Sequence, residues 1–93
     1  MHFALIYDLV DHYIERRAAL RDEHLGLARA AAERGALVLG GAFADPPDRA
    51  LLVWSSDSDD VVRAFVDADP YVSNGLVRSW EIRPWTVVVG SAS

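Results

Sequence analysis

The stretch FALIYDL, residues 3–9, decides the fold because it predicts a β-strand with apolar side chains on both faces. Successive side chains of a strand point to opposite faces, so Phe3 and Leu5 share one face while Ala4 and Ile6 share the other. A strand that is covered on one face only should instead alternate apolar and polar residues. We therefore expect both faces of this strand to be buried.

Three other stretches complete the expected sheet. Residues 37–39 and 50–54 are also apolar at consecutive positions. Residues 76–83 predict a fourth strand that Pro84 breaks, and residues 86–89 predict a short extra strand. Each aliphatic side chain left in water would forgo about 1.5–3 kcal/mol of burial. The two-sided strands therefore favour a homodimer in which two copies pack sheet against sheet.

Two helical segments separate these strands. The first is expected within residues 13–34, where Gly35 stops it. The second begins at a cap formed by Ser56 or Asp57 and runs to about Ala68. The resulting order, βαββαβ, is typical of the ferredoxin-like α+β fold, in which both helices cover one face of an antiparallel sheet.

Composition limits the classes of partner and of chemistry. The 93 residues predict one domain, residues 1–90, with residues 91–93 as a frayed C-terminal tail. A net charge of −5 argues against nucleic acid and an anionic membrane surface as partners. The chain has no cysteine, which excludes disulfides and thiolate nucleophiles. Its apolar runs are too short to span a bilayer and Asp8 interrupts the first, so we expect no signal peptide and a cytoplasmic location.

His24 is the first acid–base candidate. At about 100° per residue, four apolar residues fall within roughly 60° of it on a helix, namely Leu20, Leu27, Ala28 and Ala31. If the helix is unbroken, Arg17 lies within about 20° of His24, two turns earlier. Histidine is the side chain best suited to proton transfer near neutral pH. The alternative is a core histidine that bonds to a backbone carbonyl.

Asp69 is the second candidate. It ends the second helical run and precedes Pro70, a pattern typical of an N-cap followed by a first-turn proline, with Gly75 closing the turn. If the two helices lie side by side on one sheet, its carboxylate can meet the imidazole of His24. The roles of capping residue and acid–base partner both stay open at this point.

Other chemistries find little support in the sequence. His2, His12 and His24 lack metal-ligand spacing, so we expect no metal. The sequence has no glycine-rich phosphate loop between a strand and a helix and no nucleophile elbow. We therefore expect no bound cofactor.

Several pieces of the chain resemble the YciI-like family of small bacterial domains. They are RAALRDEHL at residues 17–25, LGG at residues 39–41, ADPY at residues 68–71 followed by Gly75, and a closing RPW at residues 83–85. Their order and spacing agree with the family over nearly the whole chain, so that residues 1–90 are expected to form a single YciI-like domain.

The resemblance implies both an assembly and an activity. The assembly is a dimeric α/β barrel built from two ferredoxin-like sheets, in agreement with the two-sided strands. The implied active site is a His–Asp pair, carried here onto His24 and Asp69. The activity associated with the family is a cofactor-free, lyase-type elimination of chloride from a chlorinated hydroxyhydroquinone.

We therefore interpret the chain as a cofactor-independent enzyme that performs acid–base chemistry on a small organic substrate, aromatic or anionic. Asp69 would orient the His24 imidazole and favour its cationic form. Four further residues are predicted to contact substrate: Arg17 and Arg21 as holders of an anionic oxygen, with Tyr71 and Gly41. The alternatives are that the arginines are solvated, that Tyr71 belongs to the core, and that Gly41 lets a loop approach closely. At the level of function, the rivals are a non-catalytic ligand-binding or accessory module and a cofactor-free oxygenase.

Overall fold

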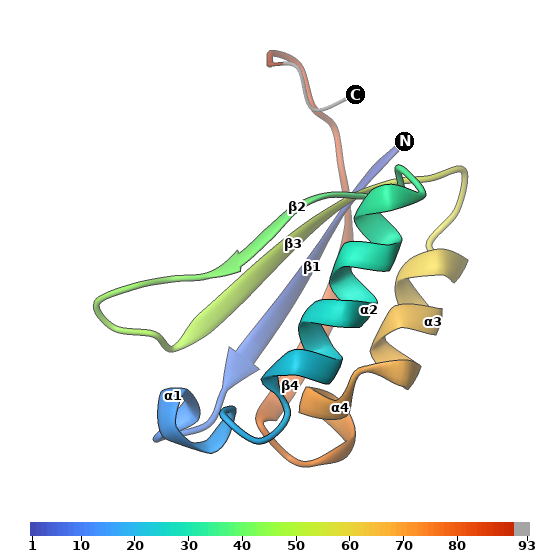
Figure 1. Cartoon of the computed structure of the whole chain (residues 1–93). Coiled ribbons are helices and arrows are strands. Elements are labelled where there is room, and N and C mark those ends of the chain that lie inside the picture. Colours follow the sequence, from blue (N-terminus) through green and yellow to red (C-terminus); the bar gives the residue numbers. More distant parts are fainter. Residues whose placement is uncertain (91–93) are drawn as a thin grey trace.

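The computed structural model describes residues 1–90, and the tail expected at residues 91–93 lies outside them. The elements follow in the order β1 (His2–Leu9), α1 (Tyr13–Arg16), α2 (Arg21–Glu33), β2 (Leu37–Ala42), β3 (Arg49–Ser55), α3 (Asp60–Ala68), α4 (Pro70–Ser73) and β4 (Val77–Trp85). The four strands form one antiparallel sheet in the order β2-β3-β1-β4. Helices α2 and α3 run side by side along one face of it (Figure 1). The ferredoxin-like α+β fold is thereby confirmed.

The core lies between this sheet and the two long helices. Strand β1 occupies the centre, and its helix-facing residues Phe3, Leu5 and Tyr7 are at most 5% exposed. In β3, Leu52 pairs with Leu5 and Trp54 pairs with Phe3, so these two side chains share the helix-facing side. Burial of this face is what fixes the register of the central strands, because a slip by one residue would turn every buried side chain outward.

The face without helices combines apolar and charged side chains. Ala4, Ile6 and Leu51 lie half-buried on it, while Val53 is only 3% exposed. Charged residues lie at the ends of β1 and β3, where Asp8 pairs with Arg49, and along β4, where Glu81 and Arg83 pair with Ile6 and Ala4. Strands β1 and β3 are thus apolar on both sides at their centre, as the sequence indicated, whereas β4 is charged on this face. The homodimer that would cover this face stays a prediction.

The first helical stretch is broken, contrary to the single helix expected within residues 13–34. Helix α1 ends at Arg16 and residues 17–20 form turns, where the backbone N–H of Leu20 donates to the carbonyl of Arg17 at 2.9 Å. Tertiary packing here overrides helix propensity, because Tyr13 is buried against Tyr71 whereas α2 must lie along the sheet. The placement of Arg17 by helical angle is therefore wrong.

The second helix begins later than expected. Its N-cap is Asp59, not Ser56 or Asp57, and the Asp59 side chain accepts no capping hydrogen bond from a backbone N–H. The Asp59 carboxylate instead pairs with Nε of Arg63 at 3.2 Å. Ser56 is still attached to the sheet, since its N–H donates to the carbonyl of Met1 at 3.0 Å. The chain must leave the sheet before a helix can start.

The end of the chain differs from expectation in two ways. Pro84 does not break the last strand, because β4 continues to Trp85 with Pro84 paired to Phe3. Strand β4 lies at the edge of the sheet, where a residue without an N–H leaves no ladder hydrogen bond unmade. The extra strand expected over residues 86–89 does not form, and Val88 and Val89 are each 86% exposed.

Candidate active site

Asp69 lies between α3 and α4 and performs two roles at once. As N-cap of α4, its Oδ1 accepts a hydrogen bond from the backbone N–H of Tyr71 at 3.0 Å, with Pro70 at the first helical position. The same Oδ1 lies 2.8 Å from Nδ1 of His24, in the first turn of α2. Gly75 ends the short helix with a φ of +78°, which glycine adopts at little cost. The capping pattern thus aims the carboxylate at the neighbouring helix.

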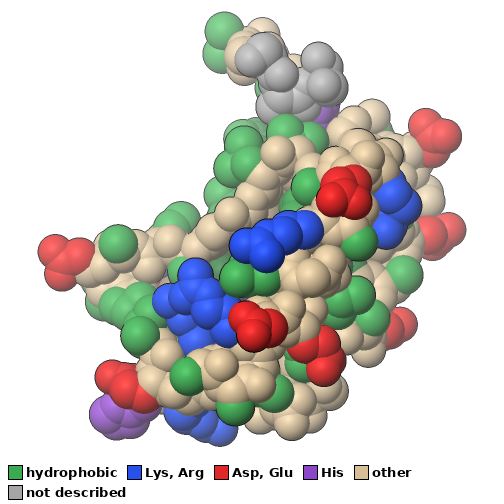
Figure 2. Space-filling model, in the orientation of Figure 1, with side chains coloured by type: hydrophobic (Ala, Val, Ile, Leu, Met, Phe, Trp, Pro, Cys, Tyr) green, Lys and Arg blue, Asp and Glu red, His purple; other side chains and the backbone are tan. Residues whose placement is uncertain are grey.

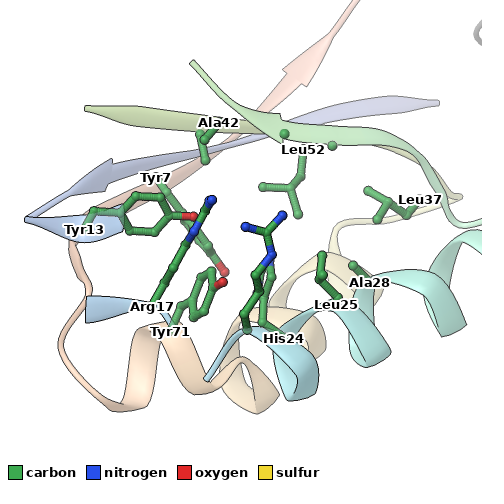
Figure 3. Close-up of a pocket in the computed structure, with 14 residues that line it drawn as sticks. Tyr7, Tyr13, Arg17, His24, Leu25, Ala28, Leu37, Ala42, Leu52 and Tyr71 are labelled. Carbon is green, nitrogen blue, oxygen red and sulfur yellow. The ribbon is translucent and has the colours of Figure 1, made fainter. Parts of the chain in front are cut away.

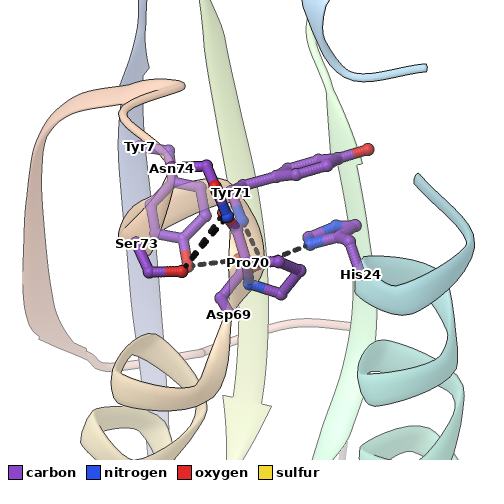
Figure 4. Close-up of polar contacts among 7 residues, drawn as sticks. All are labelled: Tyr7, His24, Asp69, Pro70, Tyr71, Ser73 and Asn74. Carbon is purple, nitrogen blue, oxygen red and sulfur yellow. Dashed lines mark hydrogen bonds and ion pairs between the residues drawn. The ribbon is translucent and has the colours of Figure 1, made fainter. Parts of the chain in front are cut away.

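The second oxygen of Asp69 is bonded to the central strand. The hydroxyl of Tyr7 donates to Oδ2 at 2.8 Å, and the carboxyl group is completely buried (Figure 4). Burial, and then the charge and hydrogen bond of Asp69, raise the pKa of Tyr7 far above its usual value. Tyr7 is therefore a protonated hydroxyl, and so a hydrogen-bond donor, near pH 7. Three donors from β1, α2 and α4 converge on one carboxylate, and this compensates for its burial.

The imidazole of His24 has a fixed orientation. Because an ionised carboxylate only accepts hydrogen bonds, Nδ1 must carry the proton that is shared with Asp69, which leaves Nε2 as the second ring nitrogen. The ring of Tyr71 stacks on the imidazole, with centroids 3.8 Å apart and planes inclined by 6°. The side chain of His24 is 14% exposed, so solvent still reaches it. The imidazole is thus held by Asp69 and Tyr71 while part of the side chain stays exposed.

A pocket of about 220 Å³ opens beside this ring (Figure 3). Its walls come from β1, β2 and β3 on one side and from α2, α4 and the turn after α1 on the other. The lining residues are Tyr7, Tyr13, Arg17, Arg21, His24, Leu25, Ala28, Leu37, Gly40, Gly41, Ala42, Ala50, Leu52 and Tyr71. This lining, within the described part of the chain, contains two arginines and no acidic side chain. The pocket is therefore suited to an anion, although the chain as a whole carries a net charge of −5.

The arginines lie close to the phenol groups. The Arg17 guanidinium carbon is 5.3 Å from the centre of the Tyr13 ring, and its side chain points toward the sheet between Tyr13 and Tyr71 (Figure 3). Burial and the neighbouring Tyr13 raise the pKa of Tyr71 to about 12, while Arg17 and Arg21 act in the opposite direction. Tyr71 is consequently a neutral hydroxyl near pH 7. In Figure 2, basic side chains gather over the start of α2, next to β2 and β3.

The structure brings the sequence-predicted site residues together. His24 and Asp69 are bonded to each other, and Arg17, Arg21 and Tyr71 line the same pocket. Asp69 itself lies behind the imidazole and does not line the pocket. Gly41 lines it through its backbone, because the strand register pairs position 41 with Leu51 on the helix-free face.

The sequence does not predict that two tyrosines, Tyr7 and Tyr13, line the pocket. Tyr7 fitted the apolar alternation of the first strand, and only its phenolic oxygen, which needs a partner when it is buried, hinted at a polar contact. Tyr13 falls within the long helix that the sequence predicts over residues 13–34, and no local signal indicates that it borders the pocket.

Within residues 1–90, no group of three or more histidine, cysteine, aspartate or glutamate side chains could hold a metal ion. Among the helices of the same range, none is long and apolar enough to cross a membrane.

Comparison with known proteins agrees with the resemblance seen in the sequence. A family profile described as YCII-related domain matches residues 1–86. Comparison with curated proteins gives no match. Among solved structures, 5-chloro-2-hydroxyhydroquinone dehydrochlorinase (TftG) from Burkholderia phenoliruptrix AC1100, in complex with 2,5-dihydroxybenzoquinone, superimposes with a TM-score of 0.77. The two chains are 19% identical, and the match covers 92% of this chain and 94% of that one. At this identity, the structural likeness supports the fold alone.

Proposed function

Because this chain belongs to the family defined by the YCII-related domain, we propose that it is a cofactor-independent enzyme whose His24–Asp69 pair performs acid–base chemistry on a small anionic or aromatic molecule. The observation that carries the proposal is the 2.8 Å contact between His24 Nδ1 and a completely buried carboxylate, beside a pocket that solvent reaches. Titratable pairs of this kind are concentrated at functional sites.

The proposed chemistry follows from the two ring nitrogens. Nδ1 is occupied by Asp69, so Nε2 is the atom that takes a proton from an acidic O–H or C–H group of the substrate. The negative charge of Asp69 then stabilises the imidazolium that forms. In an elimination, the electrons left on the substrate expel a leaving group as an anion, and the imidazolium later releases its proton to water. The net result is loss of an acid HX without any redox partner.

The proposed substrate class follows from the charge of the pocket. Arg17 and Arg21 supply the positive charge at its border, and guanidinium groups bind oxyanions through paired hydrogen bonds. Tyr71 adds a neutral hydroxyl close to both arginines. The apolar wall that includes Leu37 and Leu52 suits a carbon ring. An acidic ring compound such as the hydroxyquinone bound by TftG meets these requirements, and a lyase step like dehydrochlorination is the proposed reaction type.

The proposal also includes the assembly and location expected from the sequence. The half-buried apolar centre of the helix-free face, with Ile6 and Leu51, supports a second copy packed sheet to sheet into a dimeric barrel. The proposed location is the cytoplasm, which rests on the composition of the chain alone.

The test combines binding with turnover. Wild-type protein is titrated with 2,5-dihydroxybenzoquinone and then incubated with 5-chloro-2-hydroxyhydroquinone while chloride release is followed. We expect binding, and chloride release that His24→Ala abolishes. The matched control is His12→Asn, which changes an exposed histidine at a φ of 61° that asparagine tolerates, and which should leave the rate unchanged. An equal loss in both variants would contradict a specific role for His24.

The second candidate is a non-catalytic module that binds a small anion. It is favoured by the same arginine-bordered pocket, which needs no reactive histidine to hold a ligand. Tight binding by both wild-type protein and His24→Ala, with no turnover of ring substrates by either, would support this candidate over the enzyme.

A further inference from the structure

Four of the seven sheet residues that line the pocket are glycine or alanine, namely Gly40, Gly41, Ala42 and Ala50. Along the helix-facing side, Ala42 pairs with Ala50 and Gly40 pairs with Leu52. Farther along β3, the same side carries Trp54, which is completely buried in the core. The cavity therefore begins where the facing residues of β2 and β3 become small.

A β-bulge decides which residue of β2 faces the pocket. Strict alternation from Leu37 would turn Leu39 and Gly41 toward the helices. The pairing register shifts between Leu37 and Leu39, so that Leu39 pairs with Val53 on the helix-free face and is 58% exposed. The same shift turns Gly40 toward the helices.

Position 40 has almost no free space, whereas position 41 has ample space. A Cβ atom built on Gly40 would lie 3.2 Å from Cγ of Leu52, which is closer than ordinary van der Waals contact, and 3.6 Å from Cδ2 of the same side chain. A Cβ atom built on Gly41 would meet nothing within 4 Å. Any side chain at position 40 must therefore push Leu52, which also lines the pocket, or occupy the cavity itself.

We propose that Gly40 is a specificity-determining residue: its bare backbone sets the width between the sheet and His24, and so admits a flat ring. The opposite wall consists of His24, Leu25 and Ala28 from α2, and it cannot retreat because the His24 ring is fixed between Asp69 and Tyr71. The width of the pocket thus depends on position 40. This inference rests on the proposed function, because it concerns the ring compound bound at that site.

The test measures the affinity for 2,5-dihydroxybenzoquinone by calorimetry in wild-type protein, Gly40→Ala and Gly26→Ala. We expect Gly40→Ala to weaken binding at least about tenfold, since one misplaced methyl group in an apolar pocket typically costs ten- to two-hundred-fold. Gly26→Ala, at an exposed position of α2 that does not line the pocket and where a Cβ atom meets nothing within 4 Å, should stay within about twofold of wild type. The double variant Gly40→Ala/Leu52→Val removes bulk beside the added methyl group while it keeps an apolar wall, and it should recover most of the lost affinity. Circular dichroism and sedimentation verify the fold and assembly of each variant.

The outcomes separate the two proposals. If wild-type protein binds the quinone and Gly40→Ala binds it equally well, the role of Gly40 is overturned and the proposed function stands. Equal weakening in Gly40→Ala and Gly26→Ala would also overturn it, because the effect would then not be specific to position 40. If wild-type protein does not bind the quinone, the proposed substrate class fails, and the inference about Gly40 fails with it.

Discussion

Removing the Tyr7 hydroxyl should destabilise the protein more than removing any comparable hydroxyl. In Tyr7→Phe, Oδ2 of Asp69 loses the donor that lies 2.8 Å away, at a carboxylate with no solvent exposure. Hydrogen bonds to charged groups contribute about 1.5–3 kcal/mol, and no water can replace the hydroxyl without a rearrangement. We expect Tyr7→Phe to lower the free energy of unfolding by about 2 kcal/mol. For a domain of this size, that corresponds to a fall in Tm of about 8–16 °C.

The matched control is Tyr13→Phe. Tyr13 is 6% exposed and lines the same pocket, but its ring lies on the far side of Tyr71, 5.8 Å from it, and does not contact Asp69. In Tyr13→Phe, the free energy of unfolding should fall by less than about 1 kcal/mol, the usual contribution of a hydrogen bond between neutral groups. Urea denaturation at a fixed protein concentration gives both free energies.

A double-mutant cycle assigns the effect to the contact. In Asp69→Asn, the capping oxygen is preserved while the charged partner of Tyr7 is removed. The coupling energy between Tyr7→Phe and Asp69→Asn should be at least about 1 kcal/mol. Equal losses in Tyr7→Phe and Tyr13→Phe, or a coupling energy near zero, would refute the view that Tyr7 holds the carboxylate.

Three further predictions test other parts of the structure. Burial raises the pKa of Tyr71 to about 12, above the usual value near 10, so the stability that the neutral Tyr71 hydroxyl contributes is fully present below pH 10 and is lost as the pH rises toward 12. In Tyr71→Phe, the free energy of unfolding should therefore change less with pH in that range. Sedimentation equilibrium at micromolar protein should give a mass near twice 10.2 kDa, and a monomeric wild-type protein would contradict the dimer. The variant Ile6→Glu adds charge to the helix-free face and should shift the mass toward that of the monomer. Binding of 2,5-dihydroxybenzoquinone should weaken about tenfold or more in Arg17→Gln or Arg21→Gln, but not in Arg29→Gln, because Arg29 is exposed and does not line the pocket. If amines raise the Tm of the protein more than matched acids do, the preference of the pocket for anions is contradicted.

Local signals in the sequence predict most of the fold. Apolar runs locate the strands to within one to three residues, since a buried strand needs apolar side chains wherever it is covered. Asp69 followed by Pro70 predicts the start of α4 because capping chemistry is local. His24 is found by the same kind of reasoning, as a titratable group in the middle of an apolar helix face.

The sequence does not predict the features that depend on distant contacts. The stretch at residues 16–20 consists of arginine, alanine and leucine, all good helix formers, so that nothing local marks the break between α1 and α2. The register shift at Val38 leaves no compositional trace, and without it Gly41 and not Gly40 would face the pocket. Tyr7 is 62 positions away from Asp69, and alternation assigns it only to the core.

The most direct test of the His24–Asp69 pair is ¹⁵N NMR of the His24 ring in its neutral state. The account predicts a proton on Nδ1, held by Asp69, and an unprotonated Nε2 whose resonance shifts when 2,5-dihydroxybenzoquinone is added. Tyr7→Phe should leave the proton on Nδ1, because the bond from His24 uses the other carboxylate oxygen. A proton on Nε2 in the free protein, or an Nε2 resonance that the bound quinone does not move, would contradict the acid–base role of the pair.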